Sequence, residues 1–336
     1  QRSTELVMET MPGVLCKRRS VPIQKVGLYV PGGSAPLFST VLMLGIPAKI
    51  AGCEEVIMAS PTDAKGQVNP AVLYTANLLG ISKILKLGGA QAIAAMAYGT
   101  ESVPKVDKIF GPGNQYVTVA KQLVSRDTVA IDMPAGPSEV AVMVDKHANP
   151  AFAAADLLSQ AEHGYDSQVV LVSSSKKMAT QVIEEVNTQL QALPRKEIAR
   201  VALENSIAIV VENKTEAVAL LNEYAAEHLI LQVNNADEIA DQIINAGSIF
   251  IGPYSPESVG DYASGTNHTL PTSGWARSTA GVSLDSFVKK ITYQKLTAEG
   301  LQNIGGIVET MASHEQLEAH KNAVTIRLKA IQSGDV

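Results

Sequence analysis

The 336-residue sequence contains only two cysteines, Cys16 and Cys53. Two thiols cannot build a disulfide framework, and their number is typical of a protein from a reducing compartment, so we expect a cytoplasmic location. Basic residues are also scarce, because 27 lysines and arginines are outnumbered by 33 acidic residues. No basic stripe is available to neutralise phosphates, and we expect no nucleic-acid partner.

Long hydrophobic runs are missing as well. The longest run, residues 41–51, is interrupted by Gly45, Pro47 and Lys49. A helix that crosses a bilayer needs roughly 20 apolar residues, and no signal peptide opens the chain. We therefore expect no membrane partner.

The remaining composition is that of a globular α/β protein. Hydrophobic residues make up 46% of the chain and charged residues 18%, which excludes disorder, and the length favours two domains. Short apolar runs alternate with longer amphipathic runs, a pattern that predicts βα units on parallel sheets.

The expected elements fall into two halves and a tail, with no internal sequence repeat. Strands are predicted at 26–30, 55–59, 83–87 and 108–110, then at 140–144, 168–172, 207–211, 229–233 and 248–251. Helices are predicted at 37–51, 70–79, 90–98, 114–124, 150–162, 177–190, 215–224 and 237–246, and in a tail from Ser286 to the end. The polar stretch 252–281 reads as one long irregular loop, and such loops are often functional.

Gln160 and His163 could hold a metal ion. They lie three residues apart at the end of a predicted helix, and therefore on one face of it. Imidazole is a common zinc ligand, whereas a Gln carbonyl oxygen is an uncommon one. A tetrahedral site would need further ligands, for which Asp261 and His320 are available. A surface pair or a satisfied core pair is the alternative interpretation.

Glu227 and His228 are two adjacent proton carriers at the start of a predicted strand. Neighbours in a strand point to opposite faces, so joint use requires a turn; otherwise one side chain is solvated and the other packed. Glu315 and His320 are five residues apart, which is about 140° apart on a regular helix. Either the segment bends between them, or they meet different parts of one site, or they lie on an ordinary exposed tail.

Glycine-rich turns follow three predicted strands, at 31–34, 88–91 and 111–114. Backbone N–H groups at helix starts favour phosphates, and ligands of open α/β sheets bind at the carboxyl ends of strands. None of the turns has the Gly-x-Gly-x-x-Gly pattern, so plain tight turns remain an alternative. Neither cysteine has the setting of a nucleophile, and Ser138 lacks the Gly-x-Ser-x-Gly pattern.

Together, seven segments of the sequence resemble histidinol dehydrogenases. They are VGLYVPGG at 26–33, KIFGPGN at 108–114, IDMPAGPSEV at 131–140, LLSQAEHG at 157–164, EHL at 227–229, GDYASGTNH at 260–268 and AHKNA at 319–323. The resemblance implies zinc- and NAD-dependent oxidation of L-histidinol to L-histidine through histidinal, the last steps of histidine biosynthesis.

The resemblance also implies roles for individual residues. It places one Zn²⁺ per subunit on Gln160, His163, Asp261 and His320, and the catalytic pair on Glu227 and His228. The same four metal ligands, with Ser138, His228 and Glu315, would contact the substrate. Tyr29, Gln91 and Asn114 would contact the NAD. The chain would be a homodimer in which the C-terminal tail, with Glu315 and His320, completes the partner's site.

The implied fold has two Rossmann-like, doubly wound α/β domains with parallel sheets and a C-terminal helical tail. Residues 1–28 and 139–282 would form the metal and substrate domain, 29–138 the NAD-binding domain, and 283–336 the swapped tail. Relatives in the family carry additional residues before the position of Gln1. Ser273 and Trp275 stand where the family usually has Tyr.

Two other classes of function use the same residues. A metal-dependent hydrolase would employ Glu227 as its base, and a non-catalytic metal-binding or assembly protein would keep the ligands without turnover. Both would leave the glycine-rich turns without a role.

Overall fold

The computed structural model describes residues 1–32, 36–134 and 136–334, which form two compact units. One unit comprises residues 23–287, and the other comprises residues 1–22 with 288–336. Part of the glycine-rich turn at 31–34 falls on residues outside this description. Within the described ranges, no helix is both long and apolar enough to span a membrane.

The first sheet of the larger unit has five parallel strands in the order β5-β4-β3-β6-β7. They are β3 (Lys25–Tyr29), β4 (Glu55–Ala59), β5 (Lys83–Leu85), β6 (Lys108–Phe110) and β7 (Ala130–Ile131). The connecting helices are α1 (Phe38–Ala51), α2 (Pro70–Leu79), α3 (Gly89–Tyr98) and α4 (Gln115–Ser125).

The second sheet is also parallel and has the order β10-β9-β8-β11-β12. Its strands are β8 (Glu139–Val144), β9 (Gln168–Ser173), β10 (Ile207–Val210), β11 (His228–Gln232) and β12 (Ser248–Ile251). The helices are α5 (Pro150–Ala161), α6 (Lys176–Leu190), α7 (Lys196–Glu204), α8 (Lys214–Tyr224) and α9 (Ala236–Ala240). In both sheets the first strand in the chain is central, the next two lie on one side of it and the last two on the other. The topology is repeated although the sequence shows no repeat.

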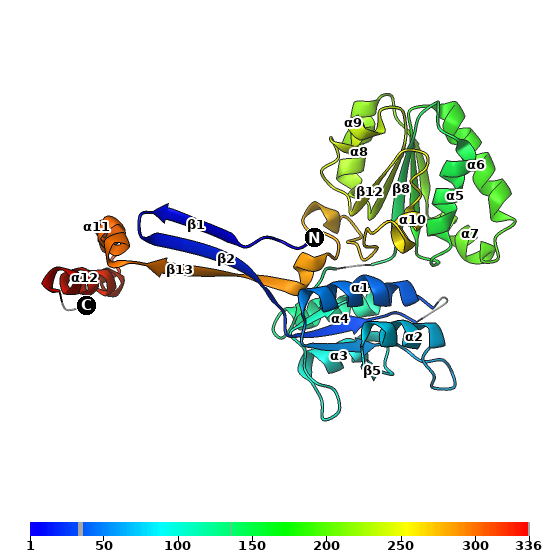
Figure 1. Cartoon of the computed structure of the whole chain (residues 1–336). Coiled ribbons are helices and arrows are strands. Elements are labelled where there is room, and N and C mark those ends of the chain that lie inside the picture. Colours follow the sequence, from blue (N-terminus) through cyan, green and yellow to red (C-terminus); the bar gives the residue numbers. More distant parts are fainter. Residues whose placement is uncertain (33–35, 135, 335–336) are drawn as a thin grey trace. The chain divides into compact units, whose positions relative to one another are not determined.

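The strand β8 shows why the second sheet is covered on both faces. All six of its residues are buried. Val140, Val142 and Val144 belong to one hydrophobic cluster, whereas Ala141 and Met143 belong to another. Successive side chains of a strand point to opposite faces, so a continuous apolar run requires helices on both sides. In Figure 1, α5 and α6 lie on one side of β8, and α8 and α9 lie on the other.

The smaller unit contains a three-stranded antiparallel sheet in the order β1-β2-β13 and two helices. The strands are β1 (Leu6–Met11), β2 (Val14–Pro22) and β13 (Val288–Leu296), and the helices are α11 (Ala298–His314) and α12 (Glu318–Ser333). The predicted α/β class with C-terminal helices is confirmed. The prediction of a helix from Ser286 is wrong for residues 288–296, because this segment is rich in β-branched residues and pairs along its whole length with β2.

Other differences also concern segments whose state depends on distant partners. Residues 6–22 form the antiparallel hairpin of β1 and β2, and residues 25–29 form the central strand of the first sheet. The family resemblance implies instead that residues 1–28 belong with the second sheet. Helix α7 was not predicted, and α9 is shorter than expected. The stretch 252–281 is not wholly irregular, since it contains α10 (Glu257–Tyr262) and a short 3-10 turn at Trp275–Arg277.

A buried ion pair shapes the turn after β6. The side chains of Lys121 and Asp132 pair with each other and are only 2% and 1% exposed. Lys121 Nζ donates to the Gly111 carbonyl at 2.8 Å, and Asp132 Oδ2 accepts from the Gly111 N–H at 2.7 Å. Gly111 has a φ of +124°, and a Cβ there would lie 2.0 Å from the Tyr29 carbonyl oxygen. The ion pair therefore holds a backbone conformation that only glycine can adopt at this position.

We predict that Asp132→Ala lowers the free energy of unfolding by about 3–5 kcal/mol, because it leaves the Lys121 ammonium buried without its counter-charge. Urea unfolding followed by circular dichroism measures the loss. The matched control is Glu197→Ala, which breaks an exposed pair with Arg200 and should cost at most about 1 kcal/mol. Equal losses in the two variants would contradict the role given to the buried pair.

Candidate active site and metal centre

A cleft of about 240 Å³ lies within the larger unit. Its lining includes Asn114, which follows β6, and Ser138 and His228, which stand at the starts of β8 and β11. His163, just after α5, and Asp261, on α10, complete the polar wall. The cleft thus meets the carboxyl end of a strand in the first sheet and the amino ends of strands in the second.

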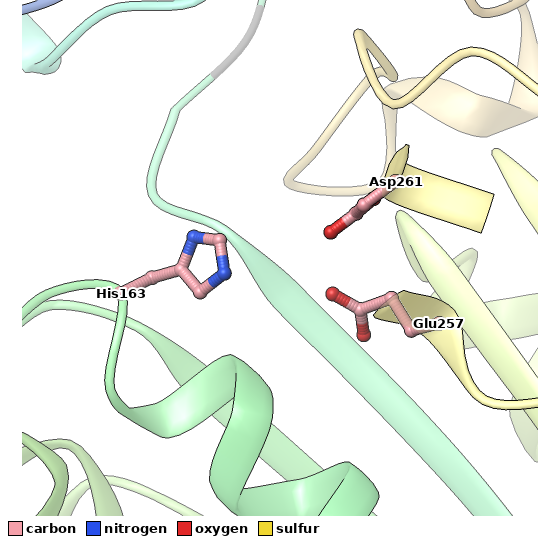
Figure 2. Close-up of side chains that lie close together, drawn as sticks. All are labelled: His163, Glu257 and Asp261. Atoms are coloured by element: carbon pink, nitrogen blue, oxygen red, sulfur yellow. The ribbon is translucent and has the colours of Figure 1, made fainter. Parts of the chain in front are cut away.

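Three of the side chains here form a cluster suited to a metal ion. Ligand atoms of His163, Glu257 and Asp261 all lie within 4.8 Å of one another. Figure 2 shows the two carboxylates turned towards the imidazole ring of His163. Glu257 and Asp261 are four residues apart on α10, one turn of helix, and so share a face. Imidazole nitrogen and carboxylate oxygen are both donors that zinc accepts.

Gln160 supplies a second sign of a missing ligand. It lies in the last turn of α5, is fully buried, and neither atom of its side-chain amide has a hydrogen-bond partner among the described residues. Buried polar atoms are nearly always paired, and an orphaned one can mark an ion site. The amide, which stands three residues before His163, fits a cation that would accept its carbonyl oxygen. The residues present therefore fit a divalent metal.

Burial alters the protonation of the cluster. It raises the pKa of Asp261 to about 6 and that of Glu257 well above its usual value, with Asp261 and Asp156 adding to the latter. Partial loss of solvent around His163, followed by the charge of Arg195, lowers the pKa of that ring. A neutral imidazole keeps a lone pair for a metal, and a bound cation would favour the ionised carboxylates.

Glu227 and His228 both line the cleft. They are 6% and 4% exposed, and Glu227 stands in a bend just before β11. This bend provides the turn that joint use of neighbours requires. His228 Nδ1 lies 3.3 Å from the Glu139 carbonyl oxygen. A carbonyl only accepts, so Nδ1 carries the hydrogen, and Nε2 presents its lone pair. Nε2 has no partner among the described residues.

The two side chains have opposite pKa shifts. Burial raises the pKa of Glu227 well above its usual value, and the nearby Glu257, Glu139 and Asp261 add to the effect. Burial lowers the pKa of His228 to about 3. His228 is therefore a neutral base across the physiological range, while Glu227 can take up and release a proton at a higher pH than an exposed carboxylate.

The residues expected to contact NAD lie near the carboxyl edge of the first sheet. Tyr29 ends β3, and its hydroxyl accepts from the Gly89 N–H at 3.0 Å. Gln91 is exposed in the first turn of α3, and Asn114 caps α4 by accepting from two backbone N–H groups. Strand order reverses between β3 and β6, and this switch point is where nucleotides bind to doubly wound sheets.

Glu315 and His320 belong to the smaller unit. Glu315 follows the last residue of α11, and His320 is an exposed residue of α12. A turn with Gln316 at a φ of +59° separates the two helices, so the segment bends between the two side chains. Their assignment to the metal and substrate site stays a prediction.

Three residues in or beside the cleft have no role predicted from the sequence. Glu257 could have been found from its four-residue spacing to Asp261, had α10 been predicted. His268 lines the cleft, and its Nδ1 lies 3.2 Å from the Asp261 carbonyl oxygen. Glu139 is buried beneath Glu227 and His228. No local pattern marks Glu139, because its partners come from another strand.

Comparisons with known proteins agree along nearly the whole chain. The family model described as histidinol dehydrogenase matches residues 1–328. The histidinol dehydrogenase of Bacteroides thetaiotaomicron is 61% identical over 332 residues, which are 99% of this chain and 78% of the relative. The chloroplastic histidinol dehydrogenase of Arabidopsis thaliana is 58% identical over 336 residues, covering 99% of this chain and 72% of the relative.

A solved structure shows the same fold. The crystal structure of histidinol dehydrogenase from Elizabethkingia anophelis superposes with a TM-score of 0.96 at 57% identity, covering 99% of this chain and 77% of that one. Sequence and fold therefore agree that the chain belongs to the histidinol dehydrogenase family, the NAD-dependent oxidoreductases of histidine biosynthesis.

Proposed function

We propose that the chain catalyses the four-electron oxidation of L-histidinol to L-histidine, through histidinal, with two NAD⁺ and one water. One observation carries the proposal. The neutral His228, whose Nε2 has no hydrogen-bond partner in the described part of the chain, and the carboxylate of Glu227 line the same cleft as His163 and Asp261 of the metal cluster. Base, second base and metal donors are thus gathered around one substrate-sized space.

Gln160, His163 and Asp261 would hold a zinc ion, with His320 as the fourth ligand. Support comes from the orphaned amide of Gln160 and the donor cluster on α10. When bound, the ion would anchor the imidazole and amino nitrogens of the substrate and so orient its alcohol. Glu257 lies in the same donor cluster and would be a neighbour or a further ligand of the ion.

The protein's own residues would divide the proton transfers. His228 Nε2 would take the hydroxyl proton of histidinol, while hydride leaves the carbon that bears this hydroxyl for NAD⁺. This step gives histidinal and the first NADH. Glu227 would then take a proton from water as it adds to the aldehyde. His228 would release the first proton to solvent and then accept a hydroxyl proton of the hydrate, while a second hydride leaves the hydrate carbon for a second NAD⁺ and histidine is formed. Tyr29, Gln91 and Asn114 would contact the dinucleotide, and Ser138 the substrate.

We infer that the working form is a homodimer in the cytoplasm. Glu315 would contact substrate, and His320 would ligate the metal, from the tail of the partner subunit. Their exposure on the α11–α12 helical pair supports this arrangement, because both side chains are available to another molecule.

A metal-dependent hydrolase with Glu227 as its base is the alternative. It would leave the glycine-rich edge of the first sheet and the Nε2 lone pair of His228 without a function.

The first prediction concerns the reaction itself. L-histidinol and NAD⁺ should give NADH, followed by absorbance at 340 nm, with two NADH formed per histidine. A chelator should abolish the rate and added Zn²⁺ should restore it, because the bound ion would orient the substrate's alcohol. NAD⁺ reduction that survives exhaustive chelation would exclude the metal-dependent assignment, and hydrolysis without NADH would favour the hydrolase.

The second prediction separates the two half-reactions. Removing a general base typically costs about 10²- to 10⁴-fold in rate. His228→Asn should lose that factor in histidinol oxidation, and Glu227→Gln should lose it in histidinal oxidation, while zinc content stays at the parent level in both. Stopped-flow NADH formation with each substrate gives the two rates. If Glu227→Gln oxidised histidinal at the parent rate, water activation would belong to another residue.

The third prediction concerns pH. Water activation needs the ionised form of Glu227, whose pKa is raised by burial, so kcat for histidinal should rise as pH increases through that raised value. His228 has a pKa lowered to about 3, so the plot of kcat against pH should show no ionisation of this ring near pH 6.5. An ionisation near pH 6.5 that disappears in His228→Asn would contradict the neutral state assigned to this ring.

A further inference from the structure

Glu139 contacts both members of the catalytic pair although it does not line the cleft. It is the first residue of β8 and is 6% exposed. Its backbone N–H donates to Glu227 Oε2 at 3.0 Å, and its carbonyl oxygen lies 3.3 Å from His228 Nδ1. A single peptide segment therefore orients the carboxylate of one residue and sets the tautomer of the other.

The side chain of Glu139 also contacts Glu227. Its Oε1 accepts from the Glu227 N–H at 3.3 Å and from the Ser273 N–H at 3.0 Å. The exchange of bonds between Glu139 and Glu227 is thus reciprocal, since each carboxylate accepts the other's backbone N–H. A carboxylate buried at such a place is expensive unless its hydrogen bonds are made, and this one makes them to the backbone that carries the site.

We call these reciprocal hydrogen bonds of Glu139 the clamp. Through Ser273 the clamp reaches the wall of the cleft. The neighbouring Thr272 accepts through its hydroxyl from the Gly136 N–H at 2.6 Å, and Gly136 lines the cleft. Ser273 has a φ of +55°, an uncommon conformation outside glycine that must be held by its surroundings. Glu139 Oε1 is one of the atoms that hold it.

We propose that Glu139 is a positioning residue of the proposed reaction, whose carboxylate oxygen holds the backbone of Glu227 and Ser273 in place for catalysis. The inference rests on the proposed function. The acceptor oxygen, rather than the negative charge, is the property required, because both partners are neutral backbone N–H groups. Displacement of the catalytic pair by about 1 Å can cost on the order of 10²-fold in rate.

Two near-isosteric variants separate the acceptor from the charge. Glu139→Gln keeps an oxygen at the position of Oε1 and removes the charge, whereas Glu139→Asp keeps the charge and shortens the reach by one methylene. We expect kcat for histidinol and histidinal to stay within about 3-fold of the parent in Glu139→Gln and to fall about 10- to 100-fold in Glu139→Asp. The KM for NAD⁺ and the zinc content should not change in either.

The chain offers a matched control at the other end of the same two strands. Asp145 follows β8, is 8% exposed, and accepts from the backbone N–H of Asn234, which follows β11. It is therefore another buried carboxylate that ties these strands together, but away from the cleft lining. Asp145→Glu alters that tie and should leave kcat per folded, zinc-loaded protein at the parent value.

The kcat values of the three variants decide the inference. The expected pattern is impairment in Glu139→Asp alone. A parent-like kcat in Glu139→Asp would overturn it, because the reach of the side chain would then not matter. Impairment in Glu139→Gln instead would show that the charge, and not the acceptor oxygen, is required. Equal impairment in Asp145→Glu would show that the position beside the catalytic pair is not special. Amide hydrogen exchange provides a test without turnover: Glu139→Asp should speed exchange at Glu227 and Ser273, and unchanged protection there would also overturn it.

The proposed function has its own sign of failure. A zinc-loaded parent protein that forms no NADH from histidinol or histidinal would contradict the reaction and, with it, the catalytic purpose of Glu139. The exchange comparison would still show whether the clamp exists. Failure of the reaction and failure of the clamp are therefore distinguishable.

Discussion

The candidate site depends on the parallel pairing of β8 with β11. This register sets His228 opposite Val140, and it brings Glu139 and Glu227 to the same edge of the second sheet just before the paired residues. Two carboxylates at such a place would repel each other in a dry environment. They are tolerated because each carboxylate accepts a hydrogen bond from a backbone N–H of the other's segment. These bonds offset the cost of burying the two charges and fix the positions of both side chains.

The two sheets share a strand order but contribute opposite ends to the cleft. The first sheet offers the carboxyl end of β6, near the switch point where ligands of doubly wound sheets usually bind. The second sheet offers the amino ends of β8 and β11, where that rule predicts no site. The turn at Gly111 is held by the buried Lys121–Asp132 pair, which hydrogen-bonds both the N–H and the carbonyl of Gly111. The same topology thus presents opposite ends of its strands to one cleft.

Unsatisfied polar atoms mark where chemistry is expected. The amide of Gln160, one oxygen of Glu257 and the Nε2 of His228 are buried without partners among the described residues. Each of these groups is close in sequence or in space to the cluster formed with His163 and Asp261. A stable fold rarely leaves such atoms unpaired, so their position beside this cluster supports a bound metal and substrate as their partners.

The sequence by itself determined the local elements and the family. Helix α2 begins at Pro70 after the capping Asn69, and β4 ends where its apolar run ends, because caps, turns and periodicity act within a few residues. Only the tertiary structure decided that residues 288–296 are a strand, since an amphipathic segment takes the form its partner requires. It also brought Glu257 to His163 and Glu139 to Glu227. Contacts of this kind depend on sheet register and helix placement over long separations, which no local pattern encodes.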